Sequence, residues 1–282
     1  MFNEFWRRAR DQPVLLQRKI AVQRSPLVII SHLLLNSNIK FQQLVGVCSD
    51  FFIHKENDII IPTVFPGDQC KTIRQRWKNK YRFATVYDTV RRILVYSAYT
   101  FSGREQKSRS NEWKIEPQAV DSDYSPPAIT RGHVFPYQFA ADQEQADSTF
   151  TLSNAAPQTE DSNQKWATQV EKPIHKEIKQ GCKLDQSQVY FVTGVVPGRN
   201  WISITRDGKE YQAGINIPSH FWSAYCCTNN KEQLVARAYI AEQENFKITK
   251  HFNKDSNIQD LNTELTKLHC LPFSVFTGLD LT

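Results

Sequence analysis

The chain has 282 residues, of which 40% are hydrophobic and 12% aromatic, and its formal net charge is +6. This length allows one large domain or two small ones, and the hydrophobic content excludes an intrinsically disordered protein. A positive charge suits a polyanionic partner, but many basic proteins bind none, so charge alone assigns no function.

The start of the chain differs from the remainder, and we divide the sequence into an atypical N-terminal segment, residues 1–45, and a single domain, residues 46–282. Residues 25–36 (SPLVIISHLLLN) are a short apolar run that follows several arginines and lysines. The run is too short for a stable membrane span, which needs about 20 apolar residues. A basic stretch before an apolar one is typical of a secretory signal or anchor, and a buried helix is the open alternative.

The cysteines indicate the compartment. Six are present and none forms a CxxC pair, which argues against a zinc cluster and favours disulfides, and hence a secreted, extracellular or lumenal protein. We predict that Cys48 pairs with Cys70, because both lie in one loop-rich segment. The other four would then pair among themselves in one of three ways: Cys182, Cys226, Cys227 and Cys270.

The first part of the domain changes from turn-rich to basic and then to strand-forming. Residues 70–82 (CKTIRQRWKNKYR) interleave cations with Trp77 and Tyr81. This composition suits a phosphate backbone and equally suits a solvated helix face. Residues 81–103 are rich in Val, Tyr, Phe and Thr, which predicts two strands with a polar break near Asp88.

A long polar loop and a helix dominate the middle of the chain. The loop covers residues 104–130, and its length alone hints at function. After a short strand predicted at 149–158, residues 163–179 carry an apolar residue at every fourth position, which predicts an amphipathic helix. Pro173 should kink or weaken its second half. The apolar stripe consists of Trp166, Val170, Ile174 and Ile178.

The last third of the chain is predominantly strand-forming. Strands are predicted at 188–198, 211–218, 221–228 and 233–242, and a short closing helix is predicted within 260–273. The sequence contains neither internal repeats nor a Gly-rich linker. It therefore predicts one α+β domain with a mostly antiparallel sheet flanked by helices.

Three side chains in the middle of the chain could together perform hydrolysis. His133 lies where a strand passes into a loop, and Asn163 opens the predicted helix that also carries Glu171. An imidazole can take a proton from water. An amide oxygen suits Mg²⁺, which keeps most of its waters and needs few protein ligands. This pattern is typical of a nuclease site with one metal ion.

Three motifs in order make the indication specific. They are residues 131–133 (RGH), 152–158 (LSNAAPQ) and 163–171 (NQKWATQVE). In this order they resemble the DNA/RNA non-specific endonuclease family, the ββα-metal nucleases. Flanking segments extend the resemblance over roughly residues 46–279, and Thr130 stands where the family has an aspartate.

The resemblance implies a ββα-metal active-site motif and hydrolysis of DNA and RNA phosphodiester bonds with little sequence preference, to 5′-phosphate and 3′-hydroxyl ends. His133 would be the general base that activates water. Asn163 would be the direct ligand of one Mg²⁺ or Mn²⁺ ion. Glu171 would hold one of the water molecules around that ion.

The resemblance also implies how the phosphate and the substrate are held. Arg131 would orient the phosphate, and Arg109 would offset the charge that builds up on phosphorus. Asn154 and Gln158 would shape the site or contact substrate. Other arginines close to Arg109 in sequence could serve in its place: Arg91, Arg92 and Arg104.

Departures from the family pattern support a second hypothesis. Thr130 removes a carboxylate, Pro173 follows Glu171 by two positions, and the bulky residues 134–139 (VFPYQF) could narrow the groove. The alternative function is that of a catalytically weak or inactive protein with a nuclease fold. It would act as an extracellular or membrane-associated module that binds nucleic acid or protein.

Overall fold

The computed structural model describes residues 48–66, 69–103, 108–110, 112–115, 121–124, 129–185, 188–244 and 257–279. The atypical N-terminal segment predicted at 1–45 lies outside the described residues, so the division of the chain into that segment and one domain stays a prediction. In the described part of the chain, no helix is long and apolar enough to cross a membrane.

A six-stranded antiparallel sheet forms the centre of the molecule, with the strand order β10-β9-β8-β5-β4-β3. Its strands are β3 (Cys70–Trp77), β4 (Lys80–Asp88), β5 (Ile93–Phe101), β8 (Val189–Arg206), β9 (Lys209–Thr228) and β10 (Leu234–Glu242). Two short antiparallel pairs lie beside it: β1 (Ile53–Lys55) with β2 (Asp58–Ile60), and β6 (Ile129–His133) with β7 (Ala155–Thr159). The mostly antiparallel sheet agrees with the sequence prediction.

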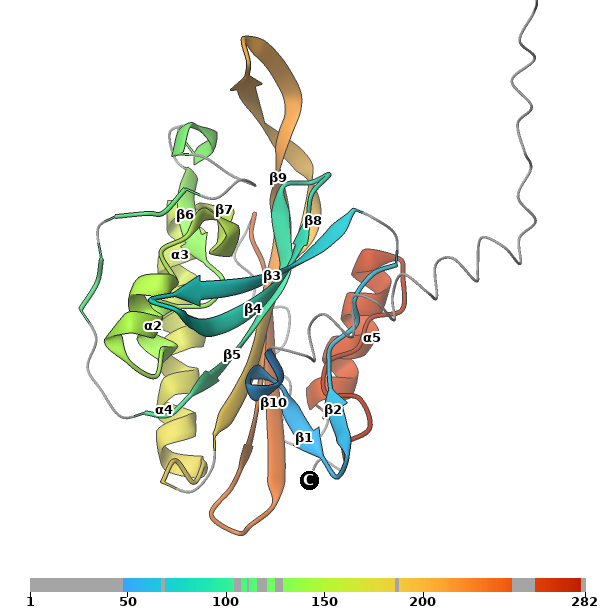
Figure 1. Cartoon of the computed structure of the whole chain (residues 1–282). Coiled ribbons are helices and arrows are strands. Elements are labelled where there is room, and N and C mark those ends of the chain that lie inside the picture. The colour runs from blue at the N-terminus through green and yellow to red at the C-terminus, as the bar shows by residue number, and fades with distance from the viewer. Residues whose placement is uncertain are drawn as a thin grey trace, which may run out of the picture.

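Helices cover both faces of this sheet (Figure 1). The helices α3 (Glu160–Trp166) and α4 (Lys172–Gly181) pack on one face, and α5 (Asn257–His269) packs on the other. The short helix α2 (Gln143–Ser148) lies on the same side as α3. Each face has its own apolar core, since Trp166, Ile174 and Ile178 belong to one buried cluster and Leu261 and Leu265 to another.

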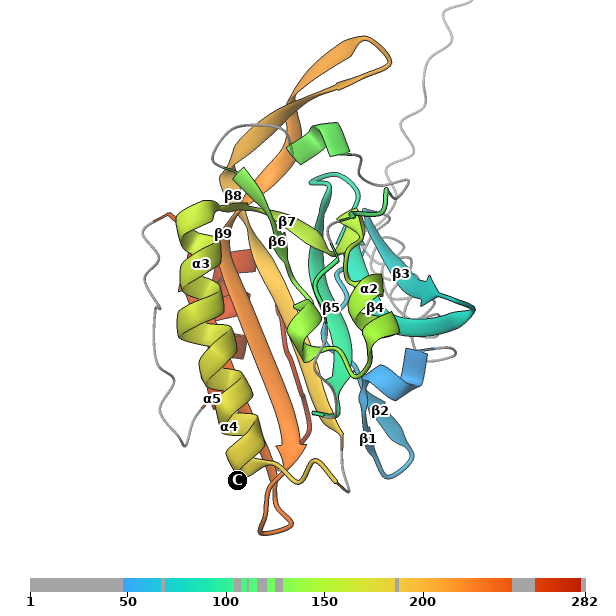
Figure 2. The ribbon, with the colours of Figure 1, turned by 90° about the vertical axis from the view of Figure 1, so that its left-hand side faces the viewer.

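The strands differ from the predicted ones mainly in length. The segments predicted at 211–218 and 221–228 form one strand, β9, because Pro218 lies opposite Pro197 at a shift in register rather than at a break. Prolines cannot donate to a ladder, and a bulge accommodates them. The hairpin of β8 and β9 projects beyond the sheet (Figures 1 and 2). The basic segment 70–82 is a strand hairpin and not a helix.

Pro173 does not break the predicted helix. A π-helical turn, Ala167–Glu171, joins α3 to α4, so the helical path runs from Glu160 to Gly181 (Figure 2). Proline lacks the N–H of a regular turn, and its ring clashes with the carbonyl four residues earlier. The wider π turn before Pro173 accommodates this defect, and such turns are frequent at functional sites.

One disulfide is present among the described residues, and it joins two of the four cysteines that were predicted to pair among themselves. The prediction that all four pair is wrong, because Cys226 and Cys270 are free thiols. Cys182 is bonded to Cys227, which joins the end of α4 to β9 across 45 residues. The predicted bond between Cys48 and Cys70, both described and both buried in the α5-side core, is not formed. Cys226 is also a buried thiol. It cannot reach Cys182, because neighbouring residues on a strand point to opposite faces and only Cys227 of the two faces α4.

The disulfide should contribute measurably to stability. Closing a loop of this length restricts the unfolded chain, so we expect Cys182→Ala with Cys227→Ala to lower the free energy of unfolding by about 2–4 kcal/mol. Urea denaturation of the double variant measures the change. Cys270→Ala, which alters an exposed cysteine, is the control. Equal midpoints for the double variant and the native chain would contradict the bond.

Candidate active site

The strands β6 and β7 and the helix α3 form one continuous unit. The two strands pair antiparallel, from Ile129 opposite Thr159 to His133 opposite Ala155. The helix begins at Glu160, directly after β7. The Thr159 side chain caps the helix by accepting a hydrogen bond from the Ser162 amide (3.2 Å). The direct turn from strand to capped helix fixes α3 against β6.

Gly132 is required by the close approach of Gln158. A Cβ atom at Gly132 would lie 2.3 Å from Gln158 Oε1, closer than any real contact allows. The Gln158 side chain is buried and donates from Nε2 to Ser162 Oγ (3.2 Å). The glycine of the RGH motif therefore makes room for the side chain that connects β7 to α3.

The hydroxyl of Thr130 orients the side chain of Asn163. Thr130 Oγ1 donates its single proton to the Gln158 carbonyl oxygen (2.9 Å). It must therefore act as acceptor towards Asn163, which donates from Nδ2 (3.0 Å). This arrangement leaves Asn163 Oδ1 without a hydrogen bond to any described residue. The side chain is half-buried, and its oxygen remains available as an acceptor.

His133 lies among aromatic rings. Its ring centroid is 4.5 Å from that of Trp113, 4.6 Å from Phe150 and 6.3 Å from Tyr137. The Nε2 atom is buried and has no hydrogen-bond partner in the described part of the chain. Burial, and then the positive charge of Arg109, lower the pKa of His133 to about 3. The imidazole is therefore neutral at neutral pH.

Two arginines lie near this histidine. The guanidinium of Arg131 is 5.8 Å from the Trp113 ring, on the face of β6 that His133 shares. Arg109 is exposed, and its charge reaches His133. Positive charge near a neutral imidazole attracts an anion, and the neutral ring can still accept a proton.

Glu171 lies in the π-helical turn and is half-buried. It makes no hydrogen bond or ion pair to the residues that the structure describes. Burial raises the pKa of its carboxyl to about 7. Its charge acts on Tyr99, whose ring stacks on Phe135 at 3.7 Å. A carboxyl that is kept without a partner is unusual for a purely structural residue.

Asn154 and Gln158 are interior residues in this structure, with exposures of 0% and 1%. The Asn154 amide accepts from the Phe135 backbone N–H (3.0 Å) and donates to the Phe135 carbonyl (3.1 Å), and so holds the segment after His133 in place. Its Nδ2 also donates to the Thr149 carbonyl (3.0 Å). Of the two expectations for this pair, shaping the site fits such burial, and contact with substrate does not.

The predicted residues fall into two groups on one hairpin. Side chains alternate along a strand, so Arg131 and His133 share one face of β6 and Thr130 shares the other with Gly132. No hydrogen bond or ring contact joins His133 to Asn163 or Glu171 among the described residues.

Three rings around His133 were not predicted from the sequence: Trp113, Tyr137 and Phe150. Trp113, a large aromatic within a polar loop, was the one available signal.

The bulky residues after His133 divide between the core and the surroundings of the His133 ring. Tyr137 lies 6.3 Å from that ring between centroids, so the narrowing of a groove stays a prediction. Val134 and Phe135 are fully buried, and Phe135 packs between Tyr99 and Phe83. The alternative arginines serve elsewhere: Arg91 is paired with Asp88 and Arg92 donates to the Gly214 carbonyl. Arg104 lies outside the described residues.

The available donors fit a hard cation better than a soft one. Among the residues whose structure is described, no three His, Cys, Asp or Glu side chains gather closely enough to hold a metal ion. The open oxygen of Asn163 and the unpaired carboxyl of Glu171 are hard oxygen donors. Mg²⁺ needs only one or two such donors, because it retains water as its remaining ligands.

The basic segment forms the edge strand of the sheet and ends near this site. Lys71, Arg74 and Arg76 are exposed on β3, and Lys114 lies 5.5 Å above the ring of Trp77 at the end of that strand. Arg82 is buried and paired with Asp142 and Glu144, so it is not available to a ligand. A charged edge also prevents unwanted strand pairing.

Comparison with known proteins identifies the family of the chain. The family model for DNA/RNA non-specific endonucleases matches residues 63–280. The human endonuclease domain-containing 1 protein is 26% identical over 212 residues, 64% of this chain and 39% of the human protein. The mouse protein of that name is 25% identical over 183 residues, 55% of this chain and 34% of its own length. The chain thus spans less than two fifths of the length of these curated relatives.

A solved structure shares the fold. The EndoG chain in the crystal structure of the EndoG/EndoGI complex superposes with a TM-score of 0.52 at 19% sequence identity, over 71% of this chain and 84% of that chain. The family model matches most of the chain, and the matched region includes the RGH strand β6, its partner strand β7 and the helix α3 that carries Asn163. The chain belongs to the DNA/RNA non-specific endonuclease family.

Proposed function

We propose that the protein is a metal-dependent endonuclease that hydrolyses DNA and RNA with little sequence preference. The observation that carries the proposal is the Asn163 amide, which Thr130 orients with its oxygen open, on a helix that directly follows the hairpin of His133. In this view β6, β7 and α3 are the ββα-metal motif of an α+β nuclease domain, with His133, Arg131, Arg109, Asn163 and Glu171 as its working residues.

His133 serves as the general base in this proposal. A neutral imidazole with an unpartnered Nε2 can accept a proton from water. A base with so low a pKa is weak, but the negative charge of a bound phosphodiester favours the imidazolium form and raises this pKa. Substrate would therefore bring the base closer to its working range.

Asn163 would hold one Mg²⁺ or Mn²⁺ ion through Oδ1, and Glu171 would accept hydrogen bonds from its water ligands. When bound, such an ion stabilises the negative charge that develops on the phosphate during hydrolysis. Arg131 orients the phosphate from the face of β6 that carries His133. Arg109 adds charge that offsets the negative transition state.

The basic edge of β3 would bind the nucleic-acid backbone. Its exposed cations lead towards Lys114 and Trp113, and Trp113 contacts the His133 ring. Contacts of this kind recognise phosphates and not bases, which accounts for a preference for DNA and RNA without sequence selection. We also propose a secreted or lumenal location, which the Cys182–Cys227 disulfide supports.

Removal of the imidazole should abolish cleavage selectively. We expect His133→Ala to reduce the rate of plasmid nicking with Mg²⁺ or Mn²⁺ by about 10²–10⁴-fold, the usual contribution of a general base. His54→Ala, which alters an exposed histidine on β1, should leave the rate unchanged.

Two results would contradict the cleavage proposal. One is equal activity in His133→Ala and the unaltered chain, and the other is no metal-dependent activity in any of the three proteins. Salt-sensitive DNA binding in EDTA, combined with the second result, would identify the protein as a nucleic-acid binding module. The uncharged Thr130 in place of an aspartate favours that second function.

The hydroxyl of Thr130 should be required for the orientation of Asn163. Thr130→Val keeps the shape of the side chain but removes the acceptor for Asn163 Nδ2, so the amide loses its orientation. We expect the Mg²⁺ concentration that gives half-maximal cleavage to rise about 10–100-fold. Thr130→Ser retains the hydroxyl and should stay within about threefold of the unaltered chain on the same scale. An identical Mg²⁺ requirement in Val and Ser variants would refute this arrangement.

Glu171→Gln should separate function from stability. The folded pKa of Glu171 is raised above its unfolded value, so stability is lost as pH rises from about 4.5 through 7. Glutamine does not titrate, and we expect it to increase the free energy of unfolding at pH 8 by roughly 1–3 kcal/mol after solvent screening. We expect cleavage to fall in the same variant. Full activity would show that Glu171 takes no part in the reaction, and lower stability would show that its carboxylate has a partner.

A further inference from the structure

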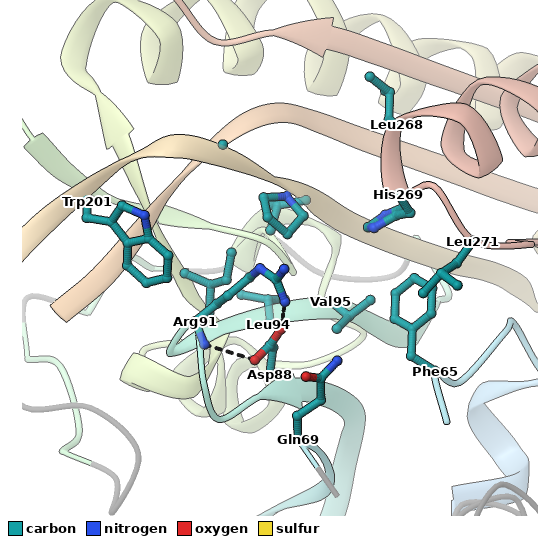
Figure 3. A pocket seen from close by; sticks show the side chains of 14 residues that line it. Phe65, Gln69, Asp88, Arg91, Leu94, Val95, Trp201, Leu268, His269 and Leu271 are labelled. Atoms are coloured by element: carbon teal, nitrogen blue, oxygen red, sulfur yellow. Dashed lines mark hydrogen bonds and ion pairs between the residues drawn. The ribbon is translucent and has the colours of Figure 1, made fainter. Parts of the chain in front are cut away.

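A cavity lies away from the candidate active site, between the start of β5, the middle of β8 and the end of α5 (Figure 3). Its volume is about 310 Å³, at the lower end of the range for small-molecule sites. None of the residues assigned to nucleic-acid cleavage lines it. What it holds is therefore a separate question.

Two basic side chains, Arg91 and His269, line this cavity. Figure 3 shows the Arg91 guanidinium reaching its centre and the His269 ring on the opposite wall. The Nε2 atom of His269 is buried and has no hydrogen-bond partner among the described residues. A buried polar atom without a partner is destabilising, so its retention points to a ligand that supplies the missing bond.

The Arg91 guanidinium is only partly used by the protein. Its Nη1 donates to Asp88 Oδ2 (2.8 Å), while its Nε and Nη2 donate to no side chain or carbonyl that the structure describes. The other Asp88 oxygen is occupied by the backbone amides of Val90 and Arg91 (both 2.9 Å). The carboxylate thus fixes the arginine in position and leaves part of its donor fork for a second acceptor.

Burial, and then the charge of Arg91, lower the pKa of His269 to about 4. The ring is therefore neutral at pH 7, and the cation is close enough to influence it. The neutral His269 ring therefore adds no charge that would offset or repel a ligand of Arg91. A single anionic group between them would accept from the Arg91 fork and from the Nε2–H of the neutral His269 ring.

Apolar and aromatic side chains form much of the remaining wall, to which Gln69 adds an amide. Phe65 packs against His269 at 5.0 Å between ring centroids, and Trp201 lies across the cavity from it (Figure 3). Leu271, at the rim, is 46% exposed. Such a wall suits a flat hydrophobic body, since an aromatic ring gains both burial and ring contacts there.

We propose that this cavity binds a small aromatic acid, whose anionic group lies between Arg91 and His269 and whose ring lies against Phe65 and Leu271. The anion is a carboxylate or a phosphate monoester, because both have acceptor oxygens that match a guanidinium. The proposal does not depend on the cleavage activity.

Isothermal titration calorimetry of the full chain with three probes tests this proposal. The probes are indole-3-acetate, 2′-deoxyadenosine 5′-monophosphate and uncharged indole. We expect at least one acid to bind more tightly than indole by about tenfold or more. Binding of only the first acid identifies aromatic carboxylates as the ligand class, and binding of only the second identifies mononucleotides. Binding of neither acid, or of indole as tightly as the acids, would overturn the proposal.

Variants assign the binding to this cavity. His269→Phe keeps the ring that stacks on Phe273 but lacks Nε2, so it should fold with an unchanged or higher melting temperature and bind the acid about tenfold more weakly. Arg91→Gln should weaken binding at least as much. Lys267→Gln removes an exposed charge from the same helix, outside the cavity, and should bind like the unaltered chain. Full binding in both His269→Phe and Arg91→Gln would place the acid elsewhere and refute the assignment.

Discussion

The hydroxyl of Thr130 is the point on which the candidate site depends. It has one proton, which is donated to the β7 backbone, and so it can only accept from Asn163 on α3. One side chain thereby connects two strands and a helix and decides which end of an amide faces outward. The same hairpin brings Gln158 across Gly132, so the glycine of the RGH motif and the orientation of Asn163 result from a single packing arrangement.

An uncharged residue at this position changes the electrostatics of the site. A carboxylate in place of Thr130 would also accept from the Asn163 amide, but it would add a negative charge where the proposed mechanism brings a phosphate. Threonine keeps the hydrogen-bond acceptor for Asn163 and does not repel a phosphate. It also attracts a cation less than a carboxylate would. His133 is neutral, and the charges that reach it come from arginine. The site is thus better suited to attract a polyanion than to bind a metal ion tightly in its absence.

Much of this arrangement could be predicted from the sequence, because it depends on local pattern. The apolar residues at every fourth position identify the helix that carries Asn163 and Glu171, and the Val- and Tyr-rich segments identify the strands of the sheet. The RGH motif placed His133 at the end of a strand, as the structure has it. The antiparallel sheet also followed from the spacing of strands and turns.

Other features depend on contacts between distant residues and could not be read from pattern. Nothing in the sequence near Thr130 shows that its partner is a helix residue 33 positions later. The π-helical turn before Pro173 replaced the predicted kink, because a proline defect can be absorbed by a wider turn as well as by a bend. The pairing of Cys182 with Cys227 needed the end of α4 to meet β9, and the expected Cys48–Cys70 bond rested only on proximity in sequence.

The central claim is that His133 on β6 and Asn163 on α3 act on the same phosphodiester bond. A double-mutant cycle on single-turnover cleavage of a short DNA duplex at saturating Mg²⁺ tests it most directly, with His133→Ala, Asn163→Ala and the double variant. Residues that act as a unit lose activity non-additively. The account predicts that the double variant is about as slow as the slower single variant. Independent, multiplicative losses in the double variant would contradict it.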